Sequence, residues 1–262
     1  MISPVAESVS NCRWKLLGEV LQPPSAIESE MKTPKPKGRG VRRIIQSIAT
    51  MALWMAAVFA SAGRIDWIRG WICATAYIIS MTIAGLLVHR RNPALLEARA
   101  NWRRKDTKPF DKVFLTILLP LGLIQPTVAG LDVVRFGWSS MPFATVYAGL
   151  ALFAMAMTLI TWAMMVNPHA ESTVRIQTDR DHKAVTCGPY RFVRHPMYVG
   201  AILMYPAAAL MFGSMWALAI SGMLALLFVW RTTLEDRTLR RELPGYEEFA
   251  AHTRYRLIPG VW

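Results

Sequence analysis

Six stretches of the 262-residue chain are strongly apolar and contain no charged side chain. They lie at residues 44–62, 70–88, 113–131, 143–166, 197–212 and 215–230. A helix rises about 1.5 Å per residue, so about 20 apolar residues cross the hydrocarbon core of a bilayer. Lipid offers backbone polar groups no partner, so such stretches fold as helices. The sequence therefore predicts an all-α fold, a polytopic transmembrane helical bundle of about six spans.

The last two stretches are shorter than the others and are separated only by Gly213 and Ser214. Each would reach only about 24 Å as a helix. A two-residue gap allows nothing longer than a tight turn. We therefore expect a short C-terminal helical hairpin that crosses a thinned region of the bilayer or nearly crosses it.

The charged residues indicate the orientation of the bundle. Hydrophobic residues make up 53% of the chain and charged residues 18%, against about 25% in soluble domains. With six spans, 27 of the 30 Lys and Arg residues fall on one side, in residues 1–43, 89–112, 167–196 and from Arg231 onward. The positive-inside rule then places both termini in the cytoplasm. The net charge of +13 is explained by this topology and by attraction to anionic membrane lipids, so no nucleic-acid partner is expected.

The composition of the apolar stretches and the spacing of the cysteines disfavour several classes of function. All 17 acidic residues lie outside the stretches, whereas ion-coupled transporters need an ionisable group near the midplane. A carrier for a neutral solute stays open, because Gln125 and Pro126 could line a path. Cys12, Cys73 and Cys187 form neither a disulfide framework nor a zinc pattern, and the histidines are too irregularly spaced for a metal motif. We predict no metal site.

We divide the chain into three parts. Residues 1–43 contain Pro23-Pro24 and a Pro/Lys/Gly run, so they are expected to form a basic, mobile cytoplasmic tail. Residues 44–166 form a four-helix transmembrane region. Residues 167–262 carry most of the polar motifs and form the candidate catalytic core, with a loop, the helical hairpin and a cytoplasmic C-terminal segment.

The segment from His182 to Gly200 is the first candidate site. Gly188-Pro189 predicts a turn, and Pro196 suits the first turn of the fifth helix. Arg194 and His195 would precede that helix, whose N-terminal N–H groups attract anions such as a carboxylate or phosphate. The two tyrosines, Tyr190 and Tyr198, could add an apolar surface, and Gly200 would allow a ligand or helix to approach closely. The alternative is that Arg194 pairs with lipid phosphate, His195 caps the helix and the tyrosines belong to the interfacial aromatic belt.

Arg231 and Glu235 are the second candidate site. They share a helix face if the sixth helix continues, because they are four residues apart. The functional interpretation is that the hairpin returns this pair to the side of His195. The alternative is a surface ion pair that contributes a few tenths of a kcal/mol.

These two segments together resemble the isoprenylcysteine carboxyl methyltransferase family, which is related to the phospholipid methyltransferases. The first part of the resemblance is the Gly-Pro-Tyr turn followed by Arg-His-Pro-x-Tyr-x-Gly. The second is Arg231, Glu235-Asp236, Gly245-Tyr246 and the segment from Tyr255 to Pro259. The resemblance covers about residues 165–262. Phe249 stands where the family has a second Tyr, and the tail lies outside the family core.

The resemblance implies an integral membrane methyltransferase that uses S-adenosylmethionine (SAM), with the acceptor entering from the bilayer. By the resemblance Arg231 orients the acceptor and Glu235 closes the cofactor pocket; both are expected to be catalytic. We add Arg194, as the cation of the predicted anion site, to the cofactor-binding residues. The residues expected to bind SAM are then His182, Val185, Gly188, Tyr190, Arg194, His195, Tyr198 and Glu235.

The acceptor and two competing classes of function stay open at this point. The acceptor is a lipophilic or small molecule that offers a carboxylate, thiol or amine. A sterol-reductase-like membrane oxidoreductase that binds NADPH has a similar Arg-His-Pro segment, usually in a longer chain with more spans. A non-enzymatic membrane scaffold or carrier would show no saturable SAM binding.

Overall fold

The computed structural model describes residues 39–100 and 106–262, with side chains from residue 49 onward. The regular structure in these ranges is entirely helical, as predicted. Most of the 1–43 tail lies outside the described residues, and α2 begins at Arg39. The elements are α2 (Arg39–Ala62), α3 (Ile68–Arg91), α4 (Pro93–Ala100), α5 (Pro109–Gly130), η1 (Leu131–Phe136), α6 (Thr145–Val166), η2 (Thr178–Arg180), η3 (Gly188–Arg191), α7 (Pro196–Phe212), α8 (Met215–Glu242) and α9 (Tyr246–His252).

Each of the six predicted apolar stretches lies within one helix, to within two residues, and the stretch 113–131 ends in η1, the π-helical turn that continues α5. Four helices of the described residues are long and apolar enough to cross a membrane: α3, α5 with η1, α6 and α8. The part of α2 whose side chains are described, Ala49–Ala62, and the whole of α7 are apolar but shorter. The protein is a multi-pass integral membrane protein built as a helical bundle.

The sixth helix is longer than the sequence predicted. Its charge-free stretch ends at residue 230, but α8 continues to Glu242 and has 28 residues, about 42 Å. The expectation that both helices of the hairpin are short is therefore wrong for α8. The extension is stable because the charged residues that follow Trp230 find partners in neighbouring segments, as described below. The fifth helix, α7, is short as expected, at 17 residues.

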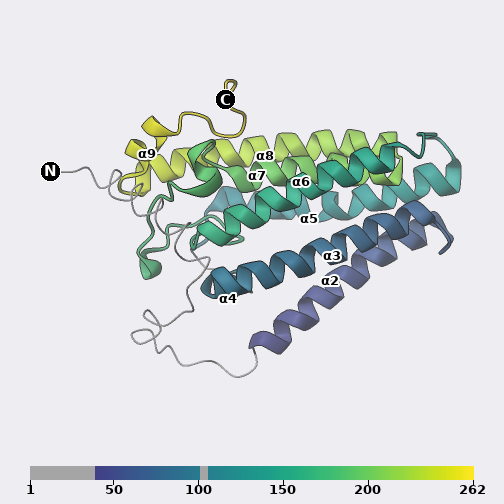
Figure 1. Ribbon diagram of the computed structural model, residues 1–262, viewed down its shortest axis with the longest axis horizontal. Coiled ribbons are helices and arrows are strands. Elements are labelled where there is room, and N and C mark those ends of the chain that lie inside the picture. The colour runs from purple at the N-terminus through teal and green to yellow at the C-terminus, as the bar shows by residue number, and fades with distance from the viewer. Residues whose placement is uncertain (1–38, 101–105) are drawn as a thin grey trace.

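The polar segments gather at one end of the bundle (Figure 1). The helices run side by side along the long axis, and short turns join them at the far end. The near end carries α4, the long segment between α6 and α7, α9 and the C-terminal segment. The loops that were predicted to share one side of the membrane therefore lie at the same end of the molecule. We call this end the loop end.

Helices α6 and α7 form the most extensive helix pair in the bundle. Two glycines allow the close approach. A Cβ atom on Gly149 would lie 2.8 Å from the carbonyl oxygen of Ala207, and one on Gly200 would lie 2.8 Å from that of Ala156. Gly200 thus admits a neighbouring helix rather than a ligand, which is one of the two alternatives that the sequence left open. This contact fixes the start of α7, where the Arg-His-Pro motif lies.

Two buried polar groups fasten the middle and the far end of the bundle. The Gln125 amide donates to Ser221 Oγ at 2.8 Å and to the carbonyl of Tyr205 at 2.9 Å, so it joins α5, α7 and α8. Asp132 is fully buried in η1 and accepts hydrogen bonds from Ser139 and Ser214. Gln125 therefore connects three helices by hydrogen bonds. This role weakens the interpretation that Gln125 lines a path for a solute.

Candidate active site

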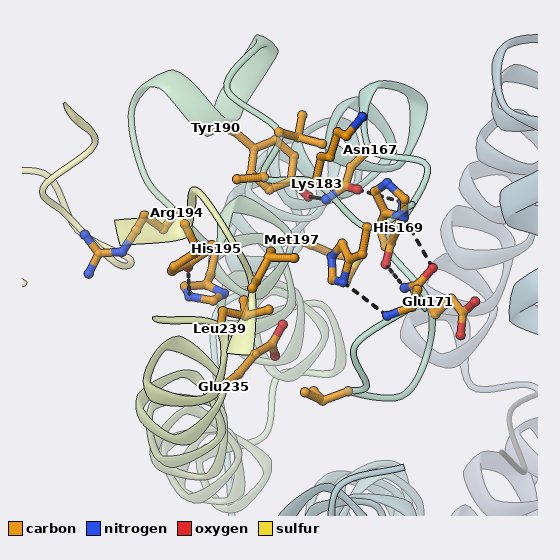
Figure 2. A pocket seen from close by; sticks show the side chains of 18 of the residues that line it. Asn167, His169, Glu171, Lys183, Tyr190, Arg194, His195, Met197, Glu235 and Leu239 are labelled. Atoms are coloured by element: carbon orange, nitrogen blue, oxygen red, sulfur yellow. Dashed lines mark hydrogen bonds between the residues drawn. The ribbon is translucent and has the colours of Figure 1, made fainter. Parts of the chain in front are cut away.

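A cavity opens at the loop end, and we call it the site cavity (Figure 2). Its walls come from the segment between α6 and α7, the first turn of α7, the last turns of α8, and α9. Eight of the nine sequence-predicted site residues line it: His182, Val185, Tyr190, Arg194, His195, Tyr198, Arg231 and Glu235. Two separate sequence motifs thus meet in one place.

The ninth predicted residue, Gly188, lies behind the cavity wall. It is buried and has a φ of +59°, a left-handed conformation that favours glycine. A Cβ atom there would lie 3.1 Å from the indole nitrogen of Trp162. Gly188 begins η3 and turns the chain so that Tyr190 faces the cavity. Its contribution is to the backbone turn that the sequence predicted.

Tyr190 forms part of the cavity wall with its ring buried. Its hydroxyl accepts a hydrogen bond from Asn167 Nδ2 at 2.9 Å, and burial raises the pKa of the phenol. Its backbone carbonyl accepts from Thr253 Oγ1 at 3.2 Å. Tyr190 is therefore held at its hydroxyl and at its backbone, and its ring presents a fixed aromatic surface to the cavity.

The Arg-His-Pro motif occupies the predicted position at the start of α7. Pro196 is the first helical residue and His195 precedes it. The backbone N–H groups of Arg194 and His195 donate to the carbonyls of Tyr255 and Arg256, at 2.9 and 3.0 Å. The C-terminal segment therefore occupies the backbone N–H groups of the two residues that precede α7. The anion site was predicted at the N–H groups of the helix itself, which these two contacts do not test.

Arg194 lines the cavity, but its guanidinium points away from it (Figure 2). Its Nε donates to Asp236 Oδ1 at 2.7 Å, and its Nη1 donates to the carbonyls of Thr253 and Arg254, both at 2.7 Å. The side chain is buried and fully engaged. Arg194 thus joins α7, α8 and the C-terminal segment, a role that the sequence motif did not reveal.

Asp236 is the centre of this polar cluster, and its side chain is fully buried. Besides Arg194 it accepts from Arg256 Nε at 2.9 Å and from the Tyr246 hydroxyl at 3.1 Å. Arg240 lies at 3.3 Å and His195 Nε2 at 3.5 Å. A single carboxylate therefore holds the Arg and the His of the Arg-His-Pro motif against α8 and α9.

Arg231 is buried on α8, with 6% of its surface exposed. Its Nε lies 2.8 Å from Asp111 Oδ1 on α5, although the N–H is not aligned for a hydrogen bond. Its guanidinium stacks on the rings of Phe114 and Tyr198, at 4.3 and 4.9 Å. The alternative of a surface ion pair between Arg231 and Glu235 is therefore wrong. The true ionic partner, Asp111, was missed by the sequence analysis.

Asp111 also reaches the loop that covers the cavity. Its Oδ2 accepts the backbone N–H of Val174 at 2.8 Å, and the carboxylate is fully buried. One signal for it existed in the sequence, since Asp111 is the last acidic residue before a long apolar stretch. Its partner could not be identified, because 120 residues separate Asp111 and Arg231 in the sequence.

Glu235 extends from α8 toward Met197 at the centre of the cavity (Figure 2). Its carboxylate accepts a hydrogen bond from the Tyr198 hydroxyl. Tyr198 in turn lies parallel to the His195 ring, with centroids 5.6 Å apart. The second residue expected to be catalytic is thus half-buried and accessible from the cavity.

The loop opposite α8 contributes a cluster that the sequence analysis did not find. Arg175 is buried and binds Glu171 through Nε at 2.9 Å and Asp179 through Nη1 at 2.7 Å. The hydrogen bonds that Arg175 donates to Glu171 are the main reason that the pKa of Arg175 is raised. These ion pairs hold the loop closed on itself. The four-residue spacing of Glu171, Arg175 and Asp179 was a signal in the sequence, although the segment that carries Glu171 and Arg175 is not helical.

Two imidazoles lie beside this cluster on the cavity wall. The rings of His169 and His182 have centroids 4.6 Å apart. Burial lowers the pKa of His169, and burial with the nearby His169 lowers that of His182 to about 4. Both rings are therefore neutral at physiological pH.

The family match covers the segment that builds this cavity. Residues 144–244 match the sequence model of the phospholipid methyltransferase family. No curated protein is detectably similar to the chain in sequence. The match spans α6 to α8 and includes every sequence-predicted site residue, whereas Asp111 and the cavity residues of α9 lie outside it. Residues 144–244 of this chain are therefore similar in sequence to the phospholipid methyltransferase family of membrane methyltransferases.

Proposed function

We propose that the protein is a SAM-dependent methyltransferase that modifies a lipophilic or small acceptor at the cytoplasmic face of the membrane. The observation that carries the proposal is the convergence of two separate motifs on the site cavity, inside the family-matched segment. The acceptor offers a carboxylate, a thiol or an amine. Both termini and the loop end face the cytoplasm in this proposal, because of the distribution of Lys and Arg.

The residues of the cavity fit the chemical parts of SAM. One wall is aromatic and aliphatic, with Tyr190, Tyr246, Phe249 and Leu239, and suits the flat face of a nucleobase. Glu235 offers a carboxylate that could accept hydrogen bonds from a ribose or stabilise a positive charge. The cavity thus combines an apolar wall with one accessible acidic group.

The charges around the cavity are also suited to a cationic sulfonium. The three buried guanidiniums that line it each lie beside a carboxylate: Arg231 beside Asp111, Arg175 beside Glu171, and Arg194 beside Asp236. The neutral rings of His169 and His182 add no positive charge at physiological pH. Glu235 accepts a hydrogen bond from the Tyr198 hydroxyl. It shares the nearby cation Arg231 with Asp111, so two carboxylates face one guanidinium. A positive ligand is therefore favoured beside Glu235.

SAM supplies an activated methyl group, which leaves the protein the tasks of alignment and exclusion of water. Arg231 is fixed by Asp111, Phe114 and Tyr198, so it can hold a polar acceptor at one position. A carboxylate or thiolate acceptor needs no strong base. An amine acceptor must lose a proton, and the Glu235 carboxylate is available to take it.

Equilibrium binding to the purified protein tests this proposal. Wild-type protein should bind SAM saturably and should bind NADPH only weakly. Glu235→Gln should weaken SAM binding and lower methyl transfer to lipid extracts, small thiols and prenylcysteine analogues. Glu242→Gln is the matched control, because it lies on the same helix but pairs with Lys108 outside the cavity. Tight NADPH binding would favour the reductase class, and no binding of either ligand would favour a scaffold or carrier.

A further inference from the structure

Two arginines near the start of α7 have no acidic partner. Residues 188–200 and 249–262 contain four arginines and no Asp or Glu. Arg194 and Arg256 both bind Asp236. Among the residues that the structure describes, no carboxylate pairs with Arg191 or Arg254, and both side chains are exposed. Arg191 lies instead over the ring of Phe192, 5.9 Å from its centroid.

Asp236 cannot serve these two arginines, because its oxygens are already occupied. Oδ1 accepts from Arg194 and Tyr246, and Oδ2 accepts from Arg256 and Arg240. The carboxylate is fully buried among these donors. Within the described residues, the positive charge of Arg191 and Arg254 is therefore available to bind a ligand.

Both arginines line one shallow hollow on the outside of the molecule. The hollow lies between η3 and the chain that follows α9. It is separate from the site cavity, since the two share no lining residue. Its lining residues are Arg191, Phe192, His252, Thr253, Arg254, Tyr255 and Pro259.

Large apolar side chains are exposed around the hollow. Phe192 is 58% exposed, Ile258 55% and Val261 77%. Tyr255 is also exposed and lines the hollow. We call Arg191, Phe192, Arg254, Tyr255, Ile258 and Val261 the C-terminal patch. Arginine beside exposed aromatic and aliphatic side chains is typical of surfaces that lie at a membrane interface.

The C-terminal patch lies at the depth where a helical bundle meets lipid headgroups. Leu257, in the same segment, is buried against Phe114, Tyr198 and Phe228, and Trp262 packs on this cluster. Phe114 lies in the second turn of α5 and Tyr198 in the first turn of α7, at the loop end of both helices. The C-terminal segment runs along the outside of α8 near the loop end (Figure 1). A segment anchored on those turns exposes its outer face at the membrane boundary.

We propose that the C-terminal patch binds the headgroup of an anionic phospholipid. Arg191 and Arg254 bind the negatively charged phosphate of the headgroup, since guanidinium groups match phosphate oxygens in geometry. The exposed apolar side chains enter the boundary between headgroups and acyl chains. This lipid is distinct from the methyl acceptor, because the hollow and the site cavity are separate.

The test compares two soluble lipids on the purified full-length chain in detergent. Native mass spectrometry follows binding of dioctanoyl phosphatidylglycerol, which is anionic, and of dioctanoyl phosphatidylcholine, which has no net charge. An arginine near an anionic headgroup strengthens binding about five-fold, so two should give wild type a preference of about 25-fold for phosphatidylglycerol. Arg191→Gln with Arg254→Gln should remove most of that preference, and the double Lys variant should keep most of it.

A matched pair of exposed arginines controls for net charge. Arg237 and Arg241 lie on the last turns of α8 and do not line the hollow. Arg237→Gln with Arg241→Gln removes the same two charges and should leave the preference intact. The double variant Phe192→Gln with Ile258→Gln should weaken the binding of both lipids to the same extent. The proposal is wrong if wild type shows no preference, if both arginine pairs lose it equally, or if the Arg191/Arg254 variant keeps it. None of these measurements needs SAM or a methyl acceptor, so the result is independent of the proposed catalysis.

Discussion

Arg231 is a charged side chain that is held out of water by specific contacts. Its guanidinium lies between two aromatic rings and beside Asp111, and it also donates to the carbonyl of Ser172 at 3.2 Å. Breaking a buried ion pair on one side is costly, because the remaining charge loses its partner. These contacts make its position at the cavity rigid, which is what a positioning group requires.

We expect Arg231→Ala to lower methyl transfer by about 10²-fold or more, the usual cost of a lost positioning group. SAM affinity should be largely kept, because Arg231 is proposed to hold the acceptor. Single-turnover methyl transfer alongside SAM binding measures both quantities. Since Arg231→Ala leaves Asp111 buried without its cation, the double variant Arg231→Ala with Asp111→Ala separates folding from positioning. Full turnover in a folded Arg231 variant would contradict the assigned role.

The His182 side chain makes the folding stability of the protein depend on pH. Its pKa is about 4 in the folded protein, below the ordinary value of 6.5. Between these values the unfolded chain binds more protons, so stability should fall as pH decreases from about 6.5 to about 4. His169 shifts in the same direction. Thermal unfolding measured across this range should show a shallower decline for His182→Gln than for wild type. His89→Gln, on the exposed end of α3, should leave the decline unchanged.

At the scale of elements, α5 and η1 carry two fully buried carboxylates at opposite ends of the bundle. Asp111 ties α5 to α8 and to Val174 in the loop at the site. Asp132 ties η1 to the α7–α8 turn through Ser214. The two residues therefore offer a matched comparison between a buried acid at the site and one far from it.

We expect Asp111→Asn to lose about 3 kcal/mol of stability, the low end for a buried ion pair broken on one side. It should also lower methyl transfer in the protein that remains folded, because Arg231 and the loop lose their common partner. Asp132→Asn should reduce stability and leave the rate per folded molecule near wild type. Thermal unfolding and single-turnover kinetics on both variants distinguish these outcomes. Equal kinetic loss in both would assign Asp111 a structural role only.

At the scale of the whole molecule, the proposed orientation can be tested by labelling. Single cysteines at Glu97 and Asp181 should react with a membrane-impermeant thiol reagent from the cytoplasmic side. Cysteines at Asp66 and Gly137 should react only from the opposite side. All four positions are exposed, and they lie at opposite ends of the bundle. The native cysteines are first replaced. Reversed accessibility would overturn the orientation, and mixed accessibility within one end would overturn the topology.

The helices could be predicted from the sequence because the free energy of insertion into lipid depends on local composition. Each of the six apolar stretches was found where predicted. The extension of α8 was missed because its charged residues are stabilised by distant partners. Distant partners also explain why the site was only partly predicted. Eight predicted residues converge there, but Asp111, Glu171 and Arg175 were not foreseen. Arg194 shows the opposite difficulty, since its motif gave the position but not the direction of its side chain.

The unbroken length of α8 has a consequence for the choice of acceptor. Phe228, Arg231 and Glu235 follow one another along one helix face, and Arg231 and Glu235 differ in height by about 6 Å. The height of Glu235 above the bilayer centre is set by a rigid helix, whereas the polar group of an acceptor dissolved in lipid follows the acyl chains. In vesicles with longer or shorter acyl chains, the polar group of the acceptor would move relative to Glu235 along the bilayer normal. Bilayer thickness should therefore influence which acceptors are methylated. Methylation of a lipid-dissolved acceptor should peak at one chain length, while methylation of a water-soluble acceptor should change little.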